Sequence, residues 1–231
     1  MNPTTRPTAP ANRAERRRPE RARALGFSGM VAQMPSRILV MSMHRYLAGV
    51  RPERADPLHA DLLDESRARV AAIRAALEAD IGSPAGWDDE RDEVEAFAYT
   101  PHDLHAVRSL VAHHEHPPRR LLRRPSFRLL ADPREHPSLR KIFSGAPTQF
   151  PHMMRHSDDR GFFLPVAFAA PSRCHEPEWW NLGSSDGLRA ELTRAEPLVE
   201  DQKETLGEMF SRLREAVERS CVLQLPLILE G

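Results

Sequence analysis

The residue types best suited to chemistry gather in one stretch after position 150. His152 and His156 are four residues apart, a spacing that places two imidazoles on one face of a helix. Asp158 could add a carboxylate oxygen, and Cys174 or His175 could supply a fourth ligand. Such a set suits Zn²⁺, which lowers the pKa of a bound water. The first interpretation is therefore a metal-dependent hydrolase.

A simpler interpretation of the same residues is a turn that shapes the backbone. Pro151 and the Ser-Asp-Asp-Arg-Gly sequence after His156 leave little room for a helix, and no His-Glu-x-x-His pattern is present. His156 and Asp158 could make local hydrogen bonds ahead of a strand, with Gly161 at a positive φ angle. We favour this interpretation and keep the zinc hydrolase as the alternative.

Nucleophilic catalysis has weaker support. Ser157 and Cys174 are the candidate nucleophiles, each with an adjacent histidine as base. Side chains of adjacent residues diverge, and the chain has no Gly-x-Ser-x-Gly elbow. Because no catalytic set is complete, we expect that the chain is not an enzyme.

Two further features indicate binding. Gly183, Ser184 and Ser185 precede a predicted helix, where backbone N–H groups either bind an anion or are capped by the serine hydroxyls. Trp179 and Trp180 are adjacent, so both rings cannot enter one core face. We expect one to be exposed, as tryptophans at protein interfaces often are.

The stretch from Pro151 to Leu192 resembles a family of uncharacterised bacterial proteins. The resemblance lies in the pattern Pro-His-x-x-x-His-Ser-Asp-x-x-Gly-aromatic-aromatic-x-Pro-Val-x-Phe, followed by Gly-Ser-Ser-x-x-Leu. Here the matching residues are Pro151, His152, His156, Ser157, Asp158, Gly161, Phe162, Phe163, Pro165, Val166, Phe168, Gly183, Ser184, Ser185 and Leu188. Ala167 stands where that family is expected to have an acidic residue. By analogy of size, the resemblance implies an immunity-type protein that neutralises a toxin or enzyme.

Apolar periodicity predicts an α+β fold, with a small, mainly antiparallel sheet packed against several helices. The predicted strands are residues 37–50, 94–99 and 162–168. Pro165 lacks an N–H donor, so we place the third strand at a sheet edge or at a bulge. The predicted helices are residues 58–80, 101–114, 137–144, 185–194 and 199–223.

The chain has 33 basic and 33 acidic residues, unevenly distributed. Arginines crowd residues 1–36, which we interpret as a disordered basic tail before a single domain over residues 37–231. Carboxylates crowd residues 88–95 and the C-terminal third. Zero net charge disfavours nucleic acid as a partner, and no apolar run is long enough for a membrane span.

Composition and motifs together favour a non-catalytic protein without cofactor. Two cysteines make no disulfide framework and no secretory signal is visible, so we expect the cytoplasm. An acidic face can neutralise a basic enzyme by complementarity. The predicted function is thus binding of a protein partner, through Trp179, Trp180, Ser184, Ser185, His156 and Asp158.

Overall fold

The computed structural model describes residues 36–51, 60–118, 132–156, 161–174 and 180–230. Within these ranges the strands form one six-stranded sheet in the order β2-β1-β6-β3-β5-β4. Their bounds are β1 Arg37–Met41, β2 Val94–Ala98, β3 Gly161–Leu164, β4 Ser172–Cys174, β5 Trp180–Ser184 and β6 Leu227–Glu230. Only the β3–β5 pairing is parallel, so the described sheet is mainly antiparallel as the sequence predicts.

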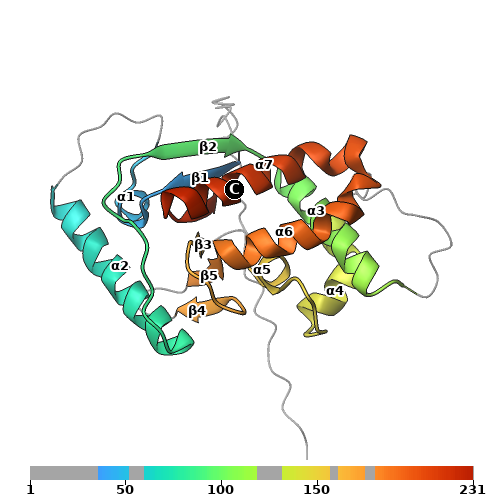
Figure 1. Ribbon diagram of the computed structural model, residues 1–231, viewed down its shortest axis with the longest axis horizontal. Coiled ribbons are helices and arrows are strands. Elements are labelled where there is room, and N and C mark those ends of the chain that lie inside the picture. Colours follow the sequence, from blue (N-terminus) through green and yellow to red (C-terminus); the bar gives the residue numbers. More distant parts are fainter. Residues whose placement is uncertain (1–35, 52–59, 119–131, 157–160, 175–179, 231) are drawn as a thin grey trace, which may run out of the picture. The chain divides into compact units, whose positions relative to one another are not determined.

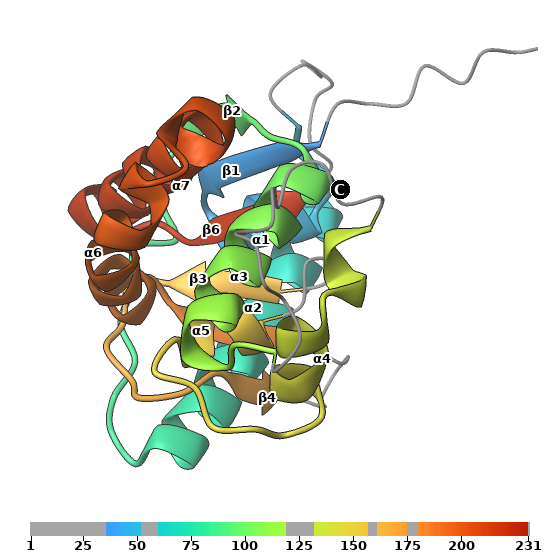
Figure 2. The same ribbon diagram turned by 90° about the vertical axis from the view of Figure 1, so that its right-hand side faces the viewer.

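Helices cover both faces of this sheet (Figures 1 and 2). Helices α1 and α2 pack on one face, and α3 to α7 pack on the other. Their bounds are α1 Met43–Leu47, α2 Ala60–Ile81, α3 Pro101–Glu115, α4 Pro137–Phe143, α5 Pro151–Arg155, α6 Ser185–Glu200 and α7 Lys203–Leu223, with a 3-10 helix η2 at Pro133–Glu135.

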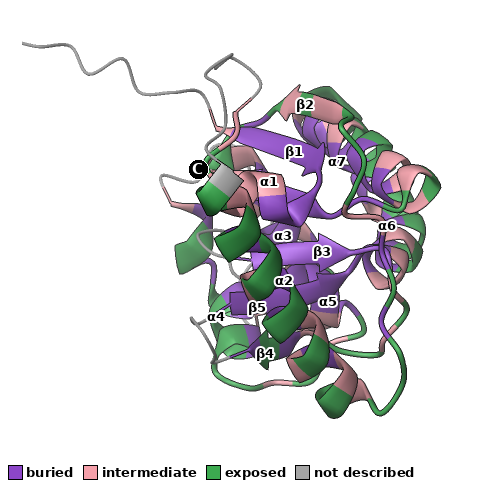
Figure 3. Cartoon of the chain, turned by 90° about the vertical axis from the view of Figure 1, so that its left-hand side faces the viewer, coloured by how far each residue is buried: buried purple, intermediate pink, exposed green. Residues whose placement is uncertain are grey.

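The alternation of side chains along each strand creates two cores. In β1, Ile38 and Val40 face α3 to α7, whereas Leu39 and Met41 face α1 and α2. All four side chains are fully buried. Figure 3 shows this arrangement: the central strands are buried, and α2 exposes its outer side to solvent. Strands buried on both faces read as apolar runs, which explains the Ile-Leu-Val-Met sequence of β1.

Most of the predicted elements are confirmed. The helix predicted over residues 58–80 is α2, which ends before Gly82 at φ 70°. Thr100 caps α3 by accepting the backbone N–H of Asp103 at 3.1 Å, as the Thr-Pro-x-Asp pattern predicts. Gly145, at φ 101°, follows α4. These elements follow from local signals, namely caps, terminating glycines and apolar spacing.

Two predicted strands differ from the structure. The strand predicted over residues 37–50 stops at Met41, because Ser42 caps helix α1 through its side chain. The strand predicted over residues 162–168 ends at Leu164, directly before Pro165. This strand is β3, which lies between β6 and β5 in the sheet, so the predicted edge position is wrong. Pro165 removes no ladder hydrogen bond because it stands after the strand rather than within it.

No described helix is long and apolar enough to cross a membrane. The predicted disordered tail lies outside the described residues, apart from Ser36. The single-domain boundary and the cytoplasmic location stay predictions.

Candidate functional site

The histidine predicted as the first metal ligand joins two segments of backbone. His152 is 2% exposed in α5. Its Nδ1 accepts the backbone N–H of Ser184 at 3.1 Å, and its Nε2 donates to the carbonyl of Phe168 at 2.9 Å. Accepting one hydrogen bond and donating the other requires the neutral imidazole. Burial favours this neutral form, because it lowers the pKa of His152. With both nitrogens engaged, His152 holds the backbone and presents no lone pair to a metal.

The second histidine is also buried and bonded to backbone. His156 stacks on Phe163 with ring centroids 3.9 Å apart, and its Nε2 donates to the carbonyl of Phe162 at 3.3 Å. Arg108, which is 2% exposed in α3, donates to the carbonyl of His156 at 3.3 Å. His156 thus connects α5 with β3 and α3.

Three glycines make room for these rings. A Cβ atom on Gly187 would overlap the ring of His152, and a Cβ on Gly183 would lie 2.9 Å from Cδ2 of His156. A Cβ on Gly161 would lie 2.8 Å from Cε1 of His156. Gly161 does not have the positive φ angle that the sequence predicts, so that prediction is wrong. The glycine is required by close approach of neighbouring atoms instead.

Ser184 caps α6, as one of the two interpretations predicts. The Oγ of Ser184 accepts the N–H of Gly187 at 2.9 Å and donates to the carbonyl of Val166 at 2.6 Å. Ser185 bonds to the hydroxyl of Ser220 at 2.8 Å. Both serines are fully buried, so their hydroxyls serve the fold.

The junction between α5 and the start of α6 also contains a buried carboxylate, which the sequence analysis missed. Glu191 of α6 is 1% exposed and accepts the backbone N–H groups of His152 and Met153 at 2.8 and 2.7 Å. Burial raises its pKa to about 7, although the two donors oppose the shift. The available signal was an acid within the apolar stripe formed by Leu188, Leu192 and Ala195.

The remaining candidate residues do not assemble a reactive centre in the described part of the chain. Cys174 is buried in β4, and Trp180 is 8% exposed with its ring 5.1 Å from that of Phe162, so Trp180 belongs to the core. Asp158, His175, Trp179 and Ser157 lie outside the described residues. No group of three potential metal ligands occurs among the described side chains.

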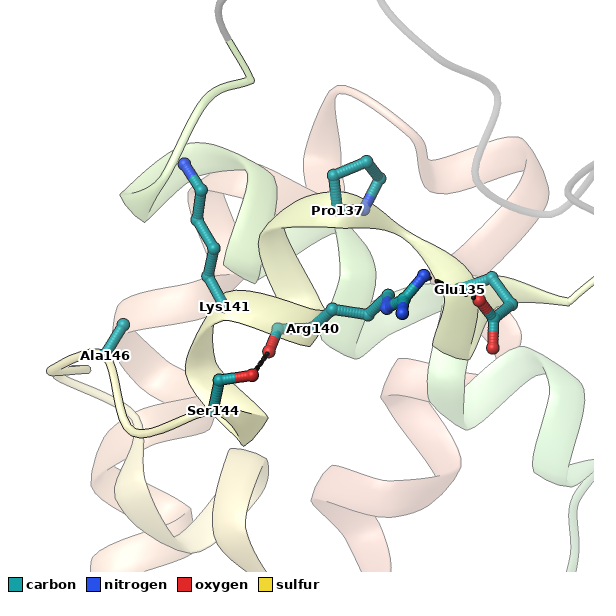
Figure 4. Close-up of a pocket in the computed structure, with 6 residues that line it drawn as sticks. All are labelled: Glu135, Pro137, Arg140, Lys141, Ser144 and Ala146. Carbon is teal, nitrogen blue, oxygen red and sulfur yellow. Dashed lines mark hydrogen bonds and ion pairs between the residues drawn. The ribbon is translucent and has the colours of Figure 1, made fainter. Parts of the chain in front are cut away.

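The side chains that line a surface hollow beside α4 do not converge on one point either. It is lined by Glu135, Pro137, Arg140, Lys141, Ser144 and Ala146. Figure 4 shows Lys141 pointing away from Ser144, while Arg140 extends toward Glu135. The guanidinium of Arg140 forms an ion pair with Glu135 at 3.1 Å, so it is already paired with a side chain of the protein.

Negative charge gathers instead on the outer face of α7. Residues spaced by three, four and seven share one face of a helix. We use the term α7 stripe for the carboxylates with this spacing: Glu204, Glu208, Glu215 and Glu218. The first three are exposed and Glu218 is half-buried, opposite the core residues Leu206, Leu213 and Val217. The stripe extends over about 21 Å at 1.5 Å per residue.

Part of the stripe is free of internal ion pairs. Glu204 and Glu215 have no basic nitrogen within 4.0 Å among the described residues, whereas Glu208 pairs with Arg212 at 2.5 Å. Glu218 lies 3.7 Å from Arg189. Glu204 and Glu215 therefore face solvent without a close ion pair in this part of the chain, although the charge of Glu215 helps to raise the pKa of Arg219.

The edge strand β2 adds carboxylates next to α7. Figure 1 shows the two elements side by side. Arg219 of α7 forms a bidentate pair with Glu95, with Nε 2.9 and 2.8 Å from its oxygens, and this hydrogen bonding lowers the pKa of Glu95. Glu93 is exposed and makes no ion pair within the described residues. Other acids of residues 88–95 are paired, as in Asp88–Arg91 and Asp92–Arg45.

Residues 49–226 match the model of a family described as "Putative DNA-mimic protein". The chain belongs to this family. Neither the curated proteins nor the solved structures contain a match. Membership overturns two predictions, the immunity-type protein and the metal-dependent hydrolase, because a DNA mimic points to imitation of nucleic acid. The acidic residues that motivated a binding role fit this family, whereas the predicted histidine chemistry does not. The resemblance of the Pro151–Leu188 pattern to uncharacterised bacterial proteins stays a prediction.

Proposed function

We propose that this chain is a non-catalytic DNA mimic that occupies the nucleic-acid-binding surface of a DNA-binding protein. The α7 stripe is the observation that carries the proposal, in a chain that belongs to a DNA-mimic family. Its carboxylates would stand in for phosphates, and basic side chains of the partner would pair with them. The partner is thus a protein, and the chain itself does not bind nucleic acid.

Charge distribution supports this role despite the neutral total. Residues 1–36 contain seven arginines and two glutamates, which leaves 26 basic and 31 acidic residues from position 37 onward. Neighbouring carboxylates of the α7 stripe are on average about 7 Å apart along the axis. One DNA strand places a phosphate about every 3.4 Å along its axis. The stripe therefore has about half the linear charge density of one DNA strand. Because the partner would bind through these charges, its affinity should weaken as the salt concentration rises.

Competition with duplex DNA tests the proposal. Proteins retained by the immobilised chain at low salt should be DNA-binding proteins that duplex DNA releases. A stripe-null variant, with Glu204, Glu208, Glu215 and Glu218 changed to Gln, should retain far less. The matched control changes four α2 carboxylates to amides: Asp61, Asp64, Glu65 and Asp80. Retention that DNA cannot reverse, or equal losses in both variants, would contradict the proposal.

A further inference from the structure

The outer side of strand β2 presents open backbone groups. β2 lies at one edge of the sheet, and no strand of the described residues pairs with its outer side (Figure 3). Tyr99 donates its N–H to the carbonyl of Ser36, which fixes the alternation along β2, with odd-numbered residues facing β1. The N–H and C=O groups of the other positions point away from the sheet: Val94, Ala96 and Ala98.

This edge lacks the features that usually prevent an edge strand from pairing with another chain. β2 contains no proline and no lysine. Its one charged residue, Glu95, turns toward α7 and pairs with Arg219. The side chains of Ala96 and Ala98 are exposed and small. A second strand could therefore approach the backbone of β2 without meeting a bulky or charged side chain.

The two ends of the edge carry opposite charges. Glu93, directly before β2, is exposed and makes no ion pair within the described residues. At the other end, Arg212 donates to the carbonyl of Ala98 at 2.9 Å and also pairs with Glu208. An antiparallel copy of the same edge would bring Glu93 of each chain toward Arg212 of the other. This complementarity favours a second copy of the chain as the partner of the edge.

We propose that two copies of this chain pair through their β2 edges, antiparallel and centred on Ala96. Ala96 then faces Ala96 of the second copy, and Val94 faces Ala98. Glu95 lies opposite Phe97 of the second copy, whereas a register centred on Glu95 would place two carboxylates directly opposite each other. Facing residues lie on the same side of a sheet, so both α7 helices would cover one face of a continuous sheet. This inference does not depend on the proposed function.

Sedimentation equilibrium of the full chain tests the pairing. The average mass should rise from the 26.2 kDa of one chain toward twice that value over about 1–200 µM, since a single strand edge is a small interface. Ala96→Pro removes the central outward N–H but no hydrogen bond to β1, so it should weaken dimerisation at least about tenfold. Ala96→Thr keeps the N–H and is the matched control, which should dimerise like the unmodified chain.

Circular dichroism of each variant verifies that the fold is retained. A chain that stays monomeric over the whole concentration range overturns the inference. Equal dimerisation of Ala96→Pro and Ala96→Thr also overturns it, because the copies would then associate through another surface.

Cysteine cross-linking tests the register independently. The Cα atoms of the two Ala96 residues would be about 5.5 Å apart, within the range of a disulfide. Those of the two Ala98 residues would be about 14 Å apart, which is four residues along a strand. Ala96→Cys should therefore form a disulfide-linked dimer under mild oxidation, and Ala98→Cys should form no more of it than the unmodified chain. Equal cross-linking of the two variants, or none with Ala96→Cys, would overturn the proposed pairing.

Discussion

The ring of His152 occupies the space where a side chain at Gly187 would have to lie. One residue comes from the short helix α5 and the other from the first turn of α6. The ring is fixed there by its hydrogen bonds to Ser184 and Phe168. Close packing of this kind makes the glycine a requirement of the junction, independent of any ligand.

Gly187→Ala should therefore destabilise the protein by about 1–3 kcal/mol, because the added methyl group displaces the ring of His152. Gly86→Ala is the matched control, since a Cβ there meets no atom within 4 Å. Urea unfolding measures both variants. In the double variant with His152→Ala the extra cost of the methyl group should disappear, which a double-mutant cycle detects. Equal costs for Gly187→Ala and Gly86→Ala would refute close packing at this junction.

His152→Ala should cost about 2–5 kcal/mol, because it leaves the N–H of Ser184 and the carbonyl of Phe168 buried without partners. His152→Asn should cost less, since its Oδ1 can still accept from Ser184. His114→Ala, at an exposed position, provides the control. Thermal and urea unfolding give the ranking. A cost for His152→Ala no larger than that of the control would exclude the anchoring role.

Local signals in the sequence predicted much of this fold. Thr100-Pro101, Ser184 and Gly145 define helix ends through contacts within a few residues, so their helices could be predicted. Strands β4, β5 and β6 were not predicted. They have three to five residues each, and β5 contains Asn and Gly, which are depleted in strands. Pairing within the sheet supplies the stability that local propensity lacks, since β6 pairs with β1 and β3, β5 pairs with β3, and β4 pairs with β5.

The candidate site was harder to predict, because the roles of its residues depend on contacts with residues far away in the sequence. Pairing of His152 with Ser184 spans 32 residues, and no local pattern distinguishes such an anchor from a metal ligand. The α7 stripe has a regular spacing, yet the sequence analysis noted only that carboxylates crowd the C-terminal third. Helical spacing of charges can be read from sequence, whereas the pairing of Arg219 with Glu95 across 124 residues cannot.

Histidine at position 136 should make the protein sensitive to acid. His136 is 4% exposed and caps α4 by accepting the N–H of Ser138 at 3.3 Å; burial, and then His113, lower its pKa to about 4. The unfolded chain binds this proton near pH 6.5, so stability present above pH 6.5 is lost as the pH falls toward 4. His136→Asn keeps a good cap and should flatten that part of the profile. Melting temperatures from pH 4.5 to 7.5 measure the slopes, and identical slopes would exclude this source.

Glu191 should act in the opposite direction. Its pKa is about 7 in the folded protein and near 4.5 when unfolded, so the folded state holds the proton more tightly. The stability from this group is complete below pH 4.5 and is lost as the pH rises through 7, by about 3 kcal/mol in total. Glu191→Gln resembles the protonated acid at every pH. Relative to the unmodified protein, this variant should therefore gain stability from pH 5 to pH 8, measured by urea unfolding at each pH. Glu204→Gln, at an exposed position, should show no such gain. A constant difference between Glu191→Gln and the unmodified protein would mean that the buried carboxyl group does not titrate in this range.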